Sequence, residues 1–172
     1  MVCAPALENG IMPDSISFQE MKPGEEKEIS ELVASVFMEF VAPGYEQQGV
    51  DEFLSFVTPE KLRDRIQSGA SFILTARENK ALVGIIEIKD IYHVALLFVD
   101  ERYHRQGIAK KLFEMALACS CSIKPGLKEI TVNSSPYSVH IYQKLGFQLN
   151  GPEQAINGIR FIPLLFQIGV RS

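Results

Sequence analysis

An almost wholly apolar run from His93 to Val99 constrains the fold of this chain more than any other feature. Continuous apolarity indicates a strand that is covered on both faces, and such a strand lies in the middle of a sheet. Gly107 to Cys119 follows with apolar residues at helical spacing, and Leu127 to Val132 is again typical of a strand. Together these segments predict a unit in which a strand, a loop, a helix and a second strand follow one another.

The elements before this unit are predicted from periodicity and turn residues. We expect residues 1–14 to be a mobile head, because they combine turn-forming residues with little periodicity. Ser15 to Met21 suits an edge strand, since polar and apolar residues alternate through most of it. Glu25 to Phe40 places its apolar residues on one face at helical spacing, which predicts an amphipathic helix.

Two short helices and a hairpin are expected next. Val50 to Val57 keeps a helical pattern, and Thr58-Pro59 is typical of an N-cap followed by a proline in the first turn of another helix. Ser71 to Ala76 and Ala81 to Ile88 are rich in β-forming residues and flank a polar turn. This arrangement predicts two antiparallel strands.

The end of the chain adds a further helix and a second hairpin. Ser135-Pro136 predicts the start of a helix that ends near Gly146, where a glycine can take the conformation of a C-cap. Asn157-Gly158 lies between two strand-like runs and is the strongest short-range signal for a hairpin. The alternation of strands and helices predicts an α/β fold.

Composition limits the class of protein. Of the 172 residues, 47% are hydrophobic, which is enough for one domain with a sizeable core over residues 15–172. The formal net charge of −4 argues against nucleic acid and anionic membrane as partners, because both attract clustered Lys and Arg. The odd cysteine count and the lack of a secretory signal or a bilayer-length apolar run favour a soluble protein of the reducing cytoplasm.

No metal cofactor is expected. Cys119 and Cys121 form a C-x-C pair whose nearest imidazole in the sequence is His104. Zinc sites use paired ligands at characteristic spacings, and these three residues do not have them. Thiols at the end of a helix are the simpler interpretation.

The loop between the central strand and the following helix has the character of a phosphate site. It runs from Asp100 to Ala109, and the small residue Gly107 lets a ligand approach the backbone. Unpaired amides at a helix start attract phosphate oxygens, and Arg105 and Lys110 add positive charge. The sequence has neither G-x-x-x-x-G-K-[ST] nor G-x-G-x-x-G, so a nucleotide-binding enzyme gains no motif support.

This loop resembles the signature of the GNAT superfamily of acyl-CoA-dependent acetyltransferases, Q/R-x-x-G-x-G/A at the start of a helix. The signature reads His104-Arg105-Gln106-Gly107-Ile108-Ala109 here, with His104 in place of glutamine or arginine. A second block, Ile141 to Phe147, resembles the Y-x-K-x-G-F element of the family. The resemblance implies a mixed, mostly antiparallel, twisted sheet of six or seven strands. Helices would cover both faces, with a V-shaped gap between the fourth and fifth strands.

The resemblance also implies that acetyl-CoA is the acyl-donor cosubstrate. Its pyrophosphate would be bound by the signature loop, namely His104, Arg105, Gln106, Gly107, Ile108, Ala109 and Lys110. Backbone groups of Phe98 and Val99, next to Leu97, would pair with the pantetheine arm. Asn133, just past the fifth strand, would contact the cofactor or cap the following turn. His104 faces the ligand or is an exposed loop histidine.

Acetyl transfer to an amine requires two proton movements. An alkylammonium such as lysine has a pKa of ~10.4, so a proton must leave before attack, and the departing thiolate needs one back. By resemblance Tyr142 returns that proton, unless it is only a packed helix tyrosine. His93, at the head of the apolar strand, and Glu87, a carboxylate on an apolar face, are the candidate bases. The alternatives are a satisfied structural role for His93, solvation at a strand end for Glu87, and a water relay through both.

The leading hypothesis is an N-acetyltransferase that moves an acetyl group directly to a primary amine within a ternary complex. No Ser-His-Asp order or promising catalytic cysteine indicates a covalent intermediate. The acceptor would be a small-molecule or peptide amine, and the acidic chain is compatible with cationic acceptors such as polyamines. Tyr45, Glu46 and the helices after them are expected to line its pocket. The alternative is an acyl-CoA-binding sensor without turnover, and either hypothesis allows a monomer or a homodimer.

Overall fold

The computed structural model of the protein describes residues 16–169. The head predicted over residues 1–14 therefore lies outside the described residues. A single mixed sheet forms the centre, with the strand order β1-β2-β3-β4-β5-β8-β6, and β7 pairs with β8. The strands are β1 Ile16–Glu20, β2 Ser71–Glu78, β3 Ala81–Lys89, β4 His93–Val99, β5 Glu129–Ser134, β6 Gln148–Leu149, β7 Gln154–Ile156 and β8 Ile159–Gln167.

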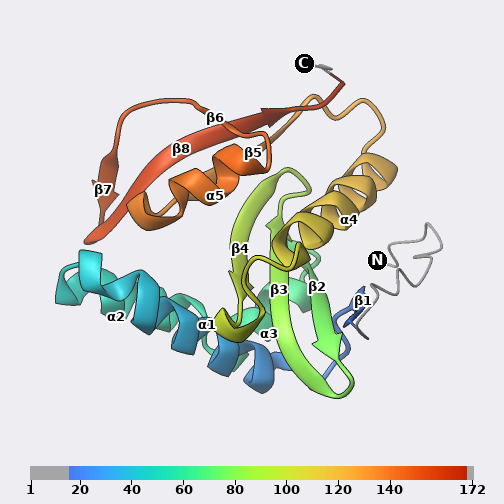
Figure 1. The fold of residues 1–172 in the computed structure, drawn as a ribbon, viewed down its shortest axis with the longest axis horizontal. Coiled ribbons are helices and arrows are strands. Elements are labelled where there is room, and N and C mark those ends of the chain that lie inside the picture. Colours follow the sequence, from blue (N-terminus) through green and yellow to red (C-terminus); the bar gives the residue numbers. More distant parts are fainter. Residues whose placement is uncertain (1–15, 170–172) are drawn as a thin grey trace.

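Helices cover both faces of the sheet. They are α1 Glu26–Phe40, α2 Gln47–Phe56, α3 Pro59–Gln67, α4 Ile108–Ile123 and α5 Val139–Lys144, with 3-10 turns η1 Ala42–Gly44, η2 Glu101–Tyr103 and η3 Pro136–Ser138. In Figure 1, α1, α2 and α3 gather in the lower part of the view, while α4 and α5 lie in its upper part. Side chains of a strand alternate between these two layers. On β2, Ile73 packs in the core beneath α1 and α3, and its neighbour Leu74 packs in the core beneath α4.

The sequence predicted most of these elements and missed some boundaries. The mixed, mostly antiparallel sheet is confirmed, and it contains eight strands because β6 is too short to leave an alternation in the sequence. α2 begins at Gln47, earlier than the predicted Val50, since its first turn is polar. The helix predicted to start at Ser135-Pro136 begins as η3, and the Ser135 hydroxyl donates to that of Ser138 at 3.0 Å.

A bulge in β4 separates this strand from β5. Glu87 of β3 opposes Leu96 and Ile88 opposes Val94, so Ala95 is the extra residue. β4 and β5 are parallel and pair only at His93 with Thr131 and at Val94 with Val132. The two strands separate beyond this point, and Figure 1 shows β4 diverging from β5 and β8. The predicted V-shaped gap between the fourth and fifth strands is confirmed.

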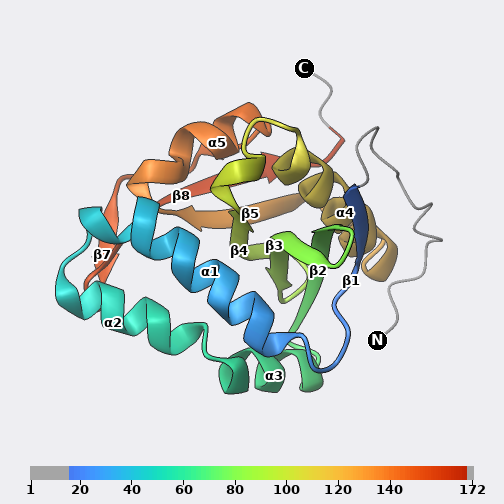
Figure 2. The same cartoon turned by 60° about the horizontal axis from the view of Figure 1, so that its bottom comes forward.

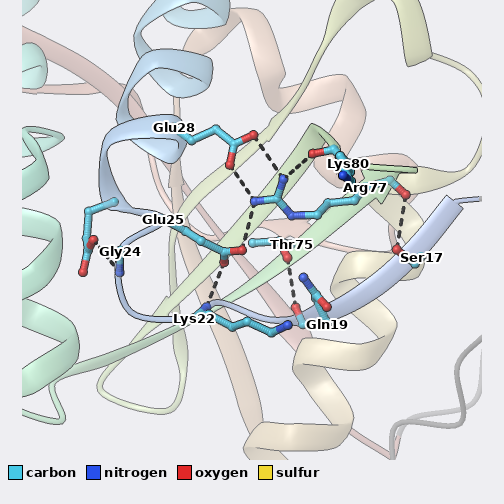
Figure 3. Close-up of polar contacts among 10 residues, drawn as sticks. Ser17, Gln19, Lys22, Gly24, Glu25, Glu28, Thr75, Arg77 and Lys80 are labelled. Carbon is cyan, nitrogen blue, oxygen red and sulfur yellow. Dashed lines mark hydrogen bonds and ion pairs between the residues drawn. The ribbon is translucent and has the colours of Figure 1, made fainter.

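Arg77 of β2 fixes the start of α1 to the sheet (Figure 3). Its Nη2 donates to Glu28 Oε2 at 2.6 Å and to Glu25 Oε1 at 3.1 Å, and its Nη1 donates to the Lys80 carbonyl at 2.8 Å. The guanidinium side chain is only 9% exposed. Hydrogen bonding to Arg77 lowers the pKa of the Glu28 carboxyl below its ordinary value. This cluster therefore sets the position of α1, whose far end reaches the gap.

Arg77→Met is expected to lower the free energy of unfolding by about 1–3 kcal/mol at about pH 7, because two carboxylates lose their partner. The lowered pKa of Glu28 makes its contribution present above the unfolded pKa, ~4.3, and lost as the pH falls through the folded pKa. The deficit should therefore shrink towards about pH 3, as urea unfolding at both pH values would measure. Lys27→Met, at a side chain 81% exposed, should change stability by less than ~0.5 kcal/mol.

Candidate functional site

Two adjoining cavities lie in the gap between β4 and β5. One, of about 400 Å³, extends to the loop before α4, and we call it the loop cavity. The other, of about 250 Å³, extends between α1, α2 and β5, and we call it the aromatic cavity. Both cavities are lined by Val41, Leu97, Phe98, Ser138 and Tyr142. These shared side chains form the place where a ligand in one cavity would meet a ligand in the other.

The predicted cofactor residues gather around the loop cavity with two exceptions. Those that line it are Leu97, Phe98, Val99, His104, Arg105, Gly107, Ile108, Ala109, Lys110 and Tyr142. Gln106 does not line it, and its side-chain amide donates to the Arg102 carbonyl at 3.4 Å. Asn133 lines the aromatic cavity instead.

The start of α4 has the features of an anion site. Gly107 is the N-cap residue with a φ of 79°, so its conformation suits glycine, and no side chain caps the first turn. The first turn has no acidic residue, while Lys110 and the preceding Arg105 line the cavity with positive charge. Gly84 of β3 lets α4 approach, since a Cβ there would lie 3.2 Å from Ile108 Cγ2. Free amides and the positive end of the α4 dipole are therefore held beside the loop cavity.

The edge of β4 offers backbone groups to the gap. The Asp100 amide donates to the Val83 carbonyl of the neighbouring β3 strand at 2.8 Å. Because successive residues of a strand direct their backbone groups to opposite sides, Phe98 also faces β3, whereas Leu97 and Val99 face the gap. Phe98 itself lines both cavities, and its role in binding a pantetheine arm stays a prediction. His104 Nε2 lies 2.7 Å from the Val99 carbonyl oxygen, so this side chain joins the signature loop to β4.

Tyr142 of α5 is placed at the junction of the two cavities. Its residue surface is 7% exposed, and its ring packs edge-on against Phe147 at 5.4 Å between centroids. Burial raises the pKa of the Tyr142 hydroxyl well above its ordinary value, so the group stays protonated at neutral pH. No hydrogen bond within residues 16–169 engages this hydroxyl. It is available as a donor to a ligand.

The aromatic cavity combines aromatic rings with small polar groups. Its rings belong to Phe37, Tyr45, Phe53, Phe56 and Phe98, contributed by α1, α2, β4 and the segment between the two helices. Phe53 stacks on Phe37 at 3.9 Å between centroids. Its polar groups are Asn133, Ser134, Ser135, Ser138 and Tyr142. None of the described residues that line it is charged.

Comparison with models of protein families shows which family the chain belongs to. Residues 41–167 match the family model of the acetyltransferase (GNAT) domain. The chain belongs to the GNAT family. The match spans most of the described chain. It includes β4, the loop before α4, and α5, which all contribute lining residues to the cavities. No curated protein matches the sequence.

Several solved structures have the same fold. A GCN5-related N-acetyltransferase of Rhodopseudomonas palustris is 15% identical with a TM-score of 0.76, over 90% of this chain and 96% of that one. PaiA N-acetyltransferase of Thermoplasma acidophilum, solved with coenzyme A, is 21% identical with a TM-score of 0.73, over 89% of this chain and 99% of its own. YjaB of Escherichia coli is 20% identical with a TM-score of 0.65, over 90% and 99%.

Two negative findings apply to residues 16–169. None of the helices in this part of the GNAT chain has both the length and the apolar character needed to span a bilayer. No three His, Cys, Asp or Glu side chains come together there in a group that could bind a metal ion.

The two predicted bases lie outside both cavities of this GNAT domain. His93 stands where β4 and β5 still pair, and its Nδ1 is 2.8 Å from Thr131 Oγ1. Burial lowers the pKa of His93, so the ring is neutral at pH 7. Glu87 is fully buried, and its carboxylate accepts hydrogen bonds from Arg65 Nε at 2.8 Å and Nη2 at 3.0 Å. Neither residue lines a cavity, so their catalytic roles stay predictions.

Glu87 has a clear structural connection to the aromatic cavity. The guanidinium of its partner Arg65 lies 3.9 Å from the centre of the Phe56 ring and donates to the Phe56 carbonyl at 2.8 Å. Phe56 is part of the cavity wall. The buried carboxylate therefore holds in place a cation that supports this wall. Solvation at a strand end, the structural role considered from the sequence, does not apply to a fully buried group.

Some cavity residues were not predicted from the sequence. Tyr45, which was expected to line the pocket of the acceptor, lines the aromatic cavity, and Glu46, which was expected there too, does not. Phe53 lies in α2, one of the helices also expected there, whereas Phe37 fits the apolar face of α1 and nothing in the sequence indicated that it borders a cavity. Tyr137 and Lys144 also line the loop cavity and were not among the predicted cofactor residues. For Lys144 the available signal was its place in the Y-x-K-x-G-F block, which begins at Tyr142 and does not include Tyr137.

The β7–β8 turn packs tightly against α2 at one side of the aromatic cavity (Figures 1 and 2). A Cβ on Gly49 would lie 2.1 Å from the Gly158 carbonyl oxygen, so the two backbones are in direct contact. The Tyr45 hydroxyl donates to the Arg160 carbonyl at 2.8 Å, and Arg160 Nη1 donates to the Gly44 carbonyl at 3.1 Å. These contacts bridge the α1–α2 connection and β8.

Gly49→Ala should lower the free energy of unfolding by about 1–3 kcal/mol, because the new methyl group forces α2 away from the hairpin. Denaturant unfolding measures this loss. Gly44→Ala is the matched control, since a Cβ there meets no atom within 4 Å, and its effect should stay below ~0.5 kcal/mol. Equal stability of the two variants would contradict the backbone contact between Gly49 and Gly158.

Proposed function

We propose that this GNAT protein is an N-acetyltransferase that moves an acetyl group from acetyl-CoA to a primary amine by direct attack. The position of Tyr142 carries this proposal. Tyr142, whose hydroxyl is protonated, lines both the loop cavity and the aromatic cavity, as do Leu97 and Phe98. A thioester that extends from the first cavity and an amine held in the second would meet next to one proton donor.

The loop cavity suits coenzyme A. The amides at the start of α4, the helix dipole, Arg105 and Lys110 would bind the pyrophosphate, which is the strongly anionic part of the molecule. The gap-facing backbone groups of Leu97 and Val99 would pair with the amides of the pantetheine arm, as another strand would. A carbonyl oxygen has two lone pairs, so Val99 can accept from both His104 and the arm.

Tyr142 would act as the general acid of the reaction. The amine nitrogen attacks the thioester carbonyl carbon, a C–N bond forms, and the C–S bond breaks. The departing thiolate takes the proton of the Tyr142 hydroxyl, and the tyrosinate regains a proton from water. The raised pKa of this hydroxyl keeps it protonated until the thiolate forms.

The amine proton would leave through water. No described His, Asp or Glu lines the aromatic cavity, so direct transfer from the amine to His93 or Glu87 has no geometric support. Glu87 is already engaged by Arg65, while neutral His93 is the better terminus for a water relay. The apolar surroundings help, because they disfavour the ammonium and lower the pKa of a bound amine.

Calorimetric titration with acetyl-CoA, followed by measurement of thiol release in the presence of primary amines, tests this proposal. Binding together with amine-dependent thiol release would support the N-acetyltransferase. Binding without release for every amine would favour the alternative, a sensor that binds acyl-CoA without turnover. Failure to bind acetyl-CoA would contradict both functions.

A further inference from the structure

We propose that the acceptor is a compact primary amine with an aromatic or branched aliphatic body and no second charge. This substrate class rests on the proposed N-acetyltransferase function and makes it more specific. It is inferred from three properties of the aromatic cavity, namely its charge, its size and its closed side. Polyamines and lysine side chains of proteins are the acceptors that it disfavours.

The charge of the cavity excludes an acceptor with a second ammonium group. None of the described lining residues is charged, and six of them, Tyr142 included, are aromatic. A polyamine that placed one amine at Tyr142 would carry another ammonium along this wall, without a carboxylate to pair with it. Burial of an unpaired charge is strongly unfavourable. The net charge of the chain, −4, therefore does not describe the site itself.

The polar groups of the cavity are few and neutral, which suits one amine nitrogen. Asn133, Ser138 and Tyr142 contribute polar groups to the wall of the cavity. The rings of Phe53 and Phe56 line it from α2. Amide and hydroxyl oxygens can accept hydrogen bonds from a neutral amine. An acceptor with one polar end and an apolar body matches this division of the walls.

The size of the cavity favours a compact body. Its volume is about 250 Å³, below the ~300–1,000 Å³ that pockets for drug-sized ligands occupy. Ring stacking keeps the wall in place, because Phe53 lies 3.9 Å from Phe37 and 5.8 Å from Phe98 between centroids. Flat or branched apolar groups gain the most from contact with aromatic faces.

The closed side of the cavity disfavours an extended peptide. The contact between Gly49 and Gly158 joins α2 to the β7–β8 turn, and the Tyr45 hydroxyl is bound to the Arg160 carbonyl. A polypeptide chain would need to pass where these segments meet. Arg160 Nε is 2.6 Å from Glu153 Oε1, so these two charges at this edge pair with each other.

A panel of acceptors tests the inference on the wild-type protein. Thiol release from acetyl-CoA would be compared for 2-phenylethylamine, 3-methylbutylamine, spermidine and a lysine-containing peptide. We expect kcat/KM to be at least about tenfold higher for the first two. Higher kcat/KM for spermidine or the peptide would overturn the substrate class and leave N-acetylation intact. Acetyl-CoA binding without release for every amine would overturn the proposed function, and the inference with it.

A charge substitution within the cavity provides the second test. Phe53→Glu places a carboxylate among the aromatic rings, and it should lower kcat/KM for 2-phenylethylamine relative to spermidine by about tenfold or more. Ser55→Glu is the matched control, because this exposed residue lies on the same helix and lines neither cavity. Acetyl-CoA affinity should stay within about threefold in both variants. An unchanged selectivity ratio in a Phe53→Glu variant that binds acetyl-CoA normally would overturn the inference.

Discussion

Gly107→Glu should weaken acetyl-CoA binding by at least about 100-fold. The substitution introduces a negative charge at the N-cap of α4, beside the amides proposed to bind pyrophosphate. Gly107 lines the loop cavity, so a side chain there would occupy the space in which a ligand approaches the backbone. Electrostatic repulsion between the new carboxylate and the phosphates adds to this steric block. Calorimetric titration of the purified variant measures the loss directly.

Gly126→Glu is the matched control for this experiment. Gly126 also adopts the left-handed conformation, with a φ of 86°, close to the 79° of Gly107. Both substitutions therefore introduce similar backbone strain. It lies in the exposed turn between α4 and β5, where a Cβ meets no atom within 4 Å. Acetyl-CoA affinity should be unchanged in Gly126→Glu. Affinity within about threefold of wild type in Gly107→Glu would refute the loop as the pyrophosphate site.

Local patterns explain why much of the fold could be predicted. β4 was recognised from its own apolar residues, α1 from its periodicity, and the β7–β8 hairpin from Asn157-Gly158. Long-range pairing left no comparable pattern. The bulge at Ala95 exists only in the register between β3 and β4, and β6 exists only because two residues meet β8. The family resemblance supplied the splayed gap that these local patterns do not encode.

The candidate site also has a part that could be predicted from local sequence and a part that could not. The signature loop is contiguous, so its residues from His104 to Lys110 could be identified together. The partner of Glu87 could not, because Arg65 comes from α3 and meets β3 only in the folded chain. A buried carboxylate in the sequence therefore suggested a base, whereas the structure shows a complete ion pair.

The aromatic cavity was the least predictable part of the molecule. Its rings come from α1, α2 and β4, and in the sequence each of them fits an apolar face that packs in the core. Periodicity identifies which face of an element is buried, but it does not distinguish packing against a neighbour from lining an open space. That distinction depends on the separation of β4 from β5.

Tyr142→Phe should lower kcat by about 100-fold while acetyl-CoA affinity stays within about threefold. General acid catalysis typically contributes ~10²–10⁴-fold, and this substitution removes only the hydroxyl that would protonate the thiolate. The ring contact with Phe147 is retained, so the protein should fold normally. Steady-state thiol release gives kcat, and calorimetry gives the affinity. A large loss of affinity with normal kcat would show that Tyr142 binds the donor and is not the acid.

Tyr137→Phe separates loss of a hydroxyl from loss of the acid. Tyr137 also lines the loop cavity, but it is 46% exposed and does not line the aromatic cavity, so kcat should change by less than about threefold.

The pH dependence of the wild type provides an independent check. Burial raises the pKa of Tyr142, so its protonated form persists above the ordinary value of ~10, and kcat should not fall between about pH 7 and pH 10 through its ionisation. A fall in this range that disappears in Tyr142→Phe would contradict a buried, protonated acid, because it would require this hydroxyl to ionise below its ordinary pKa.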